Sequence, residues 1–139
     1  MLVAAALLAQ TSAGHSVLRR AGLDMAPPSY SALSFAQPQS LPARLPARHT
    51  TMHVPFTIRN NSSDTKSYQW SLRASRIGRV GGLTARPVSG RRTLAPGATV
   101  TMDPALALSC EGGQIRITIR LASPAESIDF LSRCPTPAK

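Results

Sequence analysis

Three residue classes are scarce in this chain of 139 residues, which has six aromatic side chains, six acidic residues and two cysteines. Two thiolates fall short of the four ligands that a structural zinc site needs. The few aromatic residues, together with 12 prolines and 9 glycines, argue against a large helical core. No stretch approaches the roughly 20 consecutive apolar residues of a complete membrane-spanning helix.

The scarcity of acidic residues and histidines limits the chemistry that the chain can perform. No two carboxylates have the spacing of a general acid and base, and no nucleophile elbow or phosphate-cradling loop is present. His49 and His53 would share a face only on a helix, which the local prolines disfavour. We therefore expect no catalytic residue, no metal site and no cofactor. The remaining histidine is His15, and the acidic residues are Asp24, Asp64, Asp103, Glu111, Glu126 and Asp129.

Basic residues, by contrast, are abundant. Sixteen Lys and Arg against six Asp and Glu give a formal net charge of +10 and a pI near 11.5. The hydrophobic fraction of 42% excludes a wholly disordered chain, and the length fits one domain.

The first 23 residues have the composition of a leader. Residues 1–9 form an apolar run, and Arg19 and Arg20 follow a short polar stretch. This order is typical of a secretory signal, although no basic residue precedes the run. Three interpretations remain open: a signal peptide cut near Ala13, the tail of a signal anchor that starts upstream, or an ordinary amphipathic segment. We expect residues 1–23 to be a leader that makes the protein extracytoplasmic, either secreted or associated with a membrane through its N-terminus.

Residues 24–50 are rich in Pro, Ser, Ala and Gln. Their prolines interrupt the hydrogen-bond ladder of any long helix, so we expect an extended stalk. Within it, the short apolar pattern of residues 30–35 favours an edge strand. The unit Leu-Pro-Ala-Arg occurs twice in residues 41–48, and we interpret this repeat as a polyproline-like linker.

Apolar and polar residues alternate from residue 51 onwards, as they do in half-buried strands. Two such runs flank a turn signal at residues 60–66, and the pair predicts a hairpin. We expect Trp70 to be the large aromatic residue of the core. The inward positions are Met52, Val54, Phe56 and Ile58 in the first run, and Tyr68, Trp70, Leu72 and Ala74 in the second.

Further short strands are expected along the rest of the chain, separated by turn signals and without a convincing helix. About seven strands of this kind predict an all-β protein, an antiparallel β-sandwich over residues 51–134 with a tail at 135–139. The additional strands are expected at 83–88, 92–94, 98–102, 115–121 and 128–132.

The only two cysteines, Cys110 and Cys134, bracket the last predicted hairpin, which would bring the thiols together. A disulfide is therefore the first interpretation. Two free buried thiols, or a catalytic or metal-binding role, are the alternatives. A disulfide would favour export, because such bonds persist mainly outside the cytosol.

The arginines between residues 73 and 92 predict a basic edge of the sandwich. Such an edge could contact an anionic lipid, an acidic polymer or a nucleic acid, or serve only as a soluble coat. Nucleic acid is disfavoured, because the aromatic residues Phe56, Trp70 and Phe130 are expected in the core and no recognition helix is visible. The candidate contacts are Arg73, Arg76, Arg79, Arg86, Arg91 and Arg92.

Several short motifs carry a resemblance to a family. They are Tyr30-x-x-Leu33-x-Phe35, Val54-Pro-Phe56-Thr-Ile58-x-Asn60, Tyr68-x-Trp70 and the turn Leu94-Ala-Pro-Gly97. Together they resemble the extracytoplasmic region of small membrane-anchored or secreted actinobacterial proteins, which are mostly uncharacterised. The resemblance covers residues 30–132 and implies an immunoglobulin-like domain beside an N-terminal anchor, without catalytic residues.

We therefore expect a non-enzymatic module that binds or scaffolds at the cell envelope. Its partner would be an envelope protein or an anionic surface polymer. One alternative is an accessory domain that binds carbohydrate or an anionic polymer through the arginine-rich edge. Another is a small enzyme with an unrecognised site.

Overall fold

The computed structural model describes residues 30–139. The leader expected at residues 1–23, and the first part of the expected stalk at 24–29, lie outside the described residues. No helix in the described part of the chain is long and apolar enough to cross a membrane.

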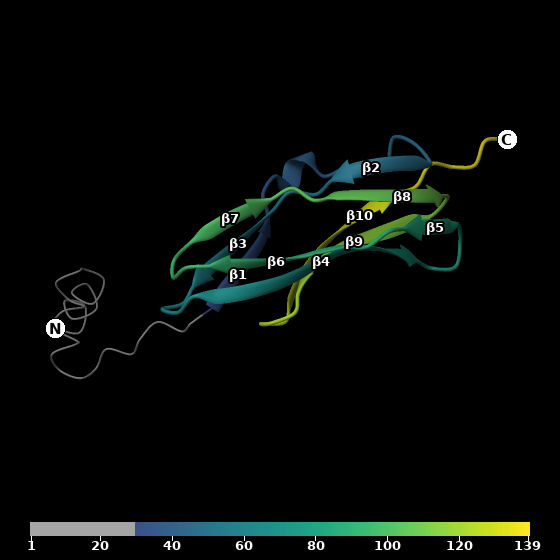
Figure 1. The fold of residues 1–139 in the computed structure, drawn as a ribbon. Coiled ribbons are helices and arrows are strands. Elements are labelled where there is room, and N and C mark those ends of the chain that lie inside the picture. The colour runs from purple at the N-terminus through teal and green to yellow at the C-terminus, as the bar shows by residue number, and fades with distance from the viewer. Residues whose placement is uncertain (1–29) are drawn as a thin grey trace, which may run out of the picture.

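The described chain consists of strands joined by turns, with one short 3-10 helix, η1, at Pro38–Ser40 (Figure 1). Every ladder between these strands is antiparallel, which confirms the prediction of an all-β protein with antiparallel sheets. The strands are β1 (Tyr30–Phe35), β2 (His49–His53), β3 (Phe56–Asn61), β4 (Lys66–Ile77), β5 (Gly82–Ala85), β6 (Val88–Leu94), β7 (Thr99–Met102), β8 (Ala105–Glu111), β9 (Gln114–Leu121) and β10 (Glu126–Arg133).

The strands form three sheets, in the orders β1-β3-β7, β2-β8-β5 and β10-β9-β4-β6. The first two sheets lie end to end in one layer, since β2 runs into β3 and β7 runs into β8 (Figure 1). Pro55 and Pro104 stand at these two junctions, and because proline has no N–H it interrupts the ladder there. The amide of Val54 still donates to the carbonyl of Pro104 at 3.1 Å and joins the two halves.

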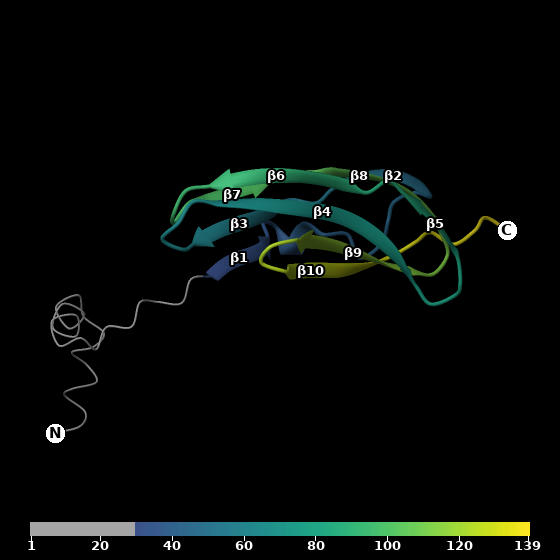
Figure 2. The same cartoon turned by 60° about the horizontal axis from the view of Figure 1, so that its bottom comes forward.

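One hydrophobic cluster joins all the sheets. Phe56 on β3 meets Trp70 on β4 with ring centroids 5.3 Å apart, and the hydroxyls of Ser31 and Tyr68 lie 2.7 Å apart. These contacts connect the layer of six short strands to the four-stranded sheet, and Figure 2 shows the two layers from another side. The fully buried apolar side chains are Val54, Phe56, Ile58, Tyr68, Leu72, Leu106, Ile117, Ile119 and Leu121.

The segment expected to be a stalk is part of the folded domain. β1 pairs with β3 at the edge of its sheet, as the pattern of residues 30–35 predicted. The prediction of a linker at residues 41–48 is wrong. Leu45 is only 3% exposed, and its amide donates to the carbonyl of Arg133 at 2.9 Å. Prolines prevent a helix but permit extended chain along a sheet edge. The domain therefore begins within the stalk and not at residue 51.

The prediction of a hairpin around residues 60–66 is also wrong. β3 pairs with β1 and β7, whereas β4 pairs with β6 and β9, so the connecting turn crosses between the layers. The buried side chain of Asn60 holds this crossing, since its amide nitrogen donates to the carbonyls of Asp64 at 2.8 Å and Leu94 at 3.1 Å. Ser62 donates from its hydroxyl to the Asn60 side-chain oxygen at 2.6 Å.

Other expectations are met in part. The single strand expected from residue 51 is divided into β2 and β3, although its four inward side chains are all buried. The hairpin of β9 and β10 forms as expected, whereas β8 was not anticipated. Tyr68 is the fully buried aromatic residue of β4, and Trp70 is half-buried beside it.

Candidate binding surfaces

Cys110 at the end of β8 and Cys134 just after β10 form a disulfide, with Cα atoms 5.6 Å apart. This confirms the first interpretation of the cysteines, and no cysteine in the described range is free. Both residues are buried, so the bond belongs to the core.

The chain around the disulfide is tightly joined. Cys134 donates its amide to the carbonyl of Gly113, and Gly112 donates to the carbonyl of Pro135. A Cβ on Gly81 would lie 2.4 Å from the carbonyl oxygen of Gly112, so only glycine permits this approach of the β4–β5 loop. The β4–β5 loop, the β8–β9 loop and the C-terminal tail therefore lie together beside the disulfide.

The six arginines predicted to form a basic edge are distributed over several surfaces. Arg73 on β4 and Arg91 on β6 lie on the outer face of the four-stranded sheet, because they pair with Thr118 and Gln69 on strands whose alternate residues are buried. These two arginines are the part of the predicted set that shares a face.

The other four arginines lie elsewhere. Arg76 donates to the carbonyl of Gly81, and Arg79 lies in the same β4–β5 loop. Arg86 borders the sheet of the opposite layer. Arg92 pairs with buried Tyr68, so it is directed to the inner side of the edge strand β6. The structure therefore divides the six arginines between several surfaces and does not bring them together at one edge.

Arg120 on β9 joins Arg73 and Arg91 on the outer face, and the sequence analysis did not include it. It pairs with Ser71, which in turn pairs with Ser89 on β6. The alternation of β9 shows that Arg120 faces outward, but only the strand register places it next to residues some fifty positions earlier. We name Arg73, Arg91 and Arg120, with Gln69, Ser71 and Ser89 between them, the basic face.

The basic face contains a depression of about 430 Å³. Its lining has two arginines and no acidic residue, so its electrostatic potential is positive. Arg116 on the same strand as Arg120 differs, because its guanidinium is paired with Asp129 at 3.3 Å. The lining residues are Gln69, Trp70, Ser71, Arg73, Ser89, Arg120 and Ala122.

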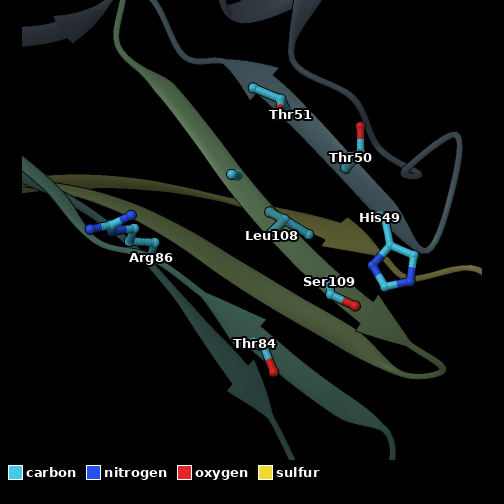
Figure 3. Close-up of a pocket in the computed structure, with 8 residues that line it drawn as sticks. His49, Thr50, Thr51, Thr84, Arg86, Leu108 and Ser109 are labelled. Carbon is cyan, nitrogen blue, oxygen red and sulfur yellow. The ribbon is translucent and has the colours of Figure 1, made fainter.

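A second depression, of about 470 Å³, lies on the outside of the β2-β8-β5 sheet. Figure 3 shows His49 on β2 and Arg86 beyond β5 at its borders, with Ser109 of β8 between the outer strands. Its lining is mainly Thr, Ser and small apolar residues, so it has less positive charge than the basic face. The lining residues are His49, Thr50, Thr51, Thr84, Arg86, Ala107, Leu108 and Ser109.

Two further ion pairs lie at the surface, away from the basic face. Nδ1 of His53 lies 3.2 Å from Asp103, and Arg48 pairs with Glu111. Within residues 30–139 no group of three His, Cys, Asp or Glu could hold a metal ion.

Comparisons with known proteins give a likeness to solved structures alone, and it is weak. No protein-family model and no curated protein sequence matches the chain. Among solved structures, the chain is similar to a FixG-related protein from Vibrio parahaemolyticus, with a TM-score of 0.37 and 10% sequence identity. The match covers 81% of this chain and 100% of the other.

Proposed function

We propose that this protein is an extracytoplasmic immunoglobulin-like module that binds or scaffolds at the cell envelope and catalyses no reaction. The buried disulfide between Cys110 and Cys134 is the observation that carries the extracytoplasmic part. Disulfides of this structural kind persist in oxidising compartments and are rare in the cytosol.

The order of the strands supports the immunoglobulin-like part. One three-stranded sheet has the order β1, β3, β7, and the four-stranded sheet in the other layer begins with β10, β9, β4 and ends with β6. These correspond to the A-B-E and G-F-C orders of immunoglobulin sandwiches. Residues 43–45 also exchange hydrogen bonds with Arg133, the last residue of β10, which connects the start of the domain to its end.

The surfaces of the domain support binding. Both depressions lie on outer sheet faces and are lined by Ser, Thr, Gln, Arg and His side chains, which can donate hydrogen bonds to a polar ligand. Both depressions lie on sheets that pack around one core, and the disulfide connects the two layers. We therefore expect both surfaces to be rigid.

Thiol labelling in cells tests the compartment. Cells that produce the full chain are denatured without reductant and treated with a maleimide, and a matched sample is reduced first. We expect label only after reduction. The Cys110→Ser variant is the positive control, because it leaves Cys134 without its partner. Equal labelling with and without reductant would reject the oxidised, extracytoplasmic module.

A further inference from the structure

The three arginines of the basic face are held apart by the register of the sheet. With strands about 4.8 Å apart and residues about 3.4 Å apart along each strand, their Cα atoms are separated by about 8, 12 and 14 Å. The shortest separation joins Arg73 and Arg120, and the longest joins Arg73 and Arg91. Such spacing suits several anionic groups along one chain better than one small anion.

The charge of these arginines is not neutralised by the protein. All three side chains belong to exposed residues, and none has an ion pair with a carboxylate in the described residues. Asp129, the carboxylate on the outer face of β10, is paired with Arg116. Each guanidinium is thus available to bind a carboxylate through two parallel N–H donors.

The surface between the arginines is made of short polar side chains. Ser71 and Ser89 pair across β4 and β6, and Gln69 lies beside them. Hydroxyl and amide groups both donate and accept hydrogen bonds, as the hydroxyls of a sugar do. The basic face therefore offers hydrogen-bond partners for sugar rings between its positive charges.

We propose that the basic face binds an acidic polysaccharide, with Arg73, Arg91 and Arg120 on successive carboxylates and Ser71 and Ser89 on sugar hydroxyls. This inference rests on the proposed function, because such polymers belong to the cell envelope and not to the cytosol.

The aromatic residues of β4 favour a polysaccharide over a single-stranded nucleic acid. Nucleic-acid platforms stack bases on aromatic rings. Tyr68 is fully buried, and the ring of Trp70 packs against Phe56 and over Gly90. Both residues occupy inward positions of the strand, so the rings are committed to the protein interior.

Polygalacturonate, a carboxylate polysaccharide, is the probe for the test, with neutral dextran as its control. Isothermal titration calorimetry of the purified protein follows the titration, because it needs no reporter group on the basic face. We expect saturable binding to polygalacturonate that weakens as salt increases, and no response to dextran. Equal responses to both polymers would overturn the proposal.

Two variants of equal charge show where the polymer binds. R73Q/R91Q/R120Q is expected to bind roughly 100-fold more weakly, because each basic residue near an anionic surface changes binding by about fivefold. The control R59Q/R79Q/R86Q removes three exposed arginines from β3, the β4–β5 loop and the border of the β2-β8-β5 sheet. It is expected to lose less than about fivefold in affinity. An equal loss in both variants would show that only net charge matters and would overturn the proposal.

The single variant R120Q keeps the test decisive if the triple variant does not fold. Arg120 is exposed and has no ion pair in the described part of the chain, so its replacement leaves the fold intact. We expect a loss of about fivefold. Unchanged affinity would exclude Arg120 from the site and overturn the proposal, which needs all three arginines.

Two further probes test the class of ligand. Single-stranded poly(dT) and vesicles of phosphatidylglycerol and phosphatidylcholine in equal parts are expected to bind more weakly than polygalacturonate. Tighter binding of either probe would overturn the choice of a polysaccharide.

The binding assays use purified, oxidised protein, so they are independent of the labelling in cells. Absent binding with protected cysteines would reject the polysaccharide and leave the extracytoplasmic module standing. Labelled cysteines in cells would reject that module itself.

Discussion

Gly90 lies directly against the indole ring of Trp70. The two residues pair across β6 and β4, and a Cβ built on Gly90 would lie 2.7 Å from the indole ring. The ring also meets Phe56 edge to face, which limits its freedom to move away from Gly90. The absence of a side chain at this position therefore allows the indole to cover the edge strand.

The Gly90→Ala variant tests this contact. Extra volume in a packed site forces side chains from their preferred positions, so we expect the free energy of unfolding to fall by about 1–3 kcal/mol. Urea denaturation measures the change. Gly82→Ala is the control, because nothing lies within 4 Å of its added Cβ. Equal stability of the two variants would contradict the packing described for Trp70.

At the residue scale, alternation in the sequence predicts which side chains face inward. It correctly places Met52, Val54, Phe56 and Ile58 in the core. It does not reveal that Asn60, a typical turn residue, is buried, because the carbonyl of Leu94 that it binds comes from a distant part of the chain. Such a role depends on tertiary structure.

The elements differ most from expectation where the chain is rich in proline. Extended chain in a linker and extended chain along a sheet edge have the same local conformation, so composition alone does not separate them. The burial of Leu45 and its hydrogen bond to Arg133 of β10 show that this segment runs along a sheet edge and is not a linker. Similarly, a turn signal does not show whether two strands pair or cross between layers, as β3 and β4 do.

The Leu45→Ala variant tests whether the proline-rich segment belongs to the domain. Truncating a buried leucine removes transfer free energy and leaves a cavity, so we expect a loss of about 2–5 kcal/mol in unfolding free energy. Leu131→Ala provides the comparison, since Leu131 is 43% exposed and should change stability little. Chemical denaturation monitors both. A segment that is only a stalk would give no loss at Leu45.

At the scale of the whole molecule, the disulfide connects the end of β8 in one layer to the chain that follows β10 in the other. It joins residues separated by 24 positions and fixes the tail beside the β8–β9 loop. On the chain-entropy account, a loop of this size stabilises the folded state by about 3 kcal/mol. We expect the double variant C110S/C134S to lose about this amount relative to the oxidised protein, measured by thermal and urea unfolding. An unchanged stability would show that the bond does not restrain the unfolded chain.

The fold class and the disulfide could be read from the sequence because both depend on local alternation and on the position of two residues. The basic face could not, because Arg120 and Arg73 become neighbours only through the register of β9 on β4. Charge counting found the arginines but grouped them by sequence position instead of by sheet face.

Mapping the contact on the protein tests the central claim, that this chain is a binding module whose contact surface is the basic face. Amide chemical shifts of the isotope-labelled, oxidised chain are followed while polygalacturonate is added. We predict that the shifts concentrate on β4, β6 and β9 around Ser71, Ser89 and Arg120. Shifts confined to the β2-β8-β5 depression around His49, or no shifts at all, would contradict the account.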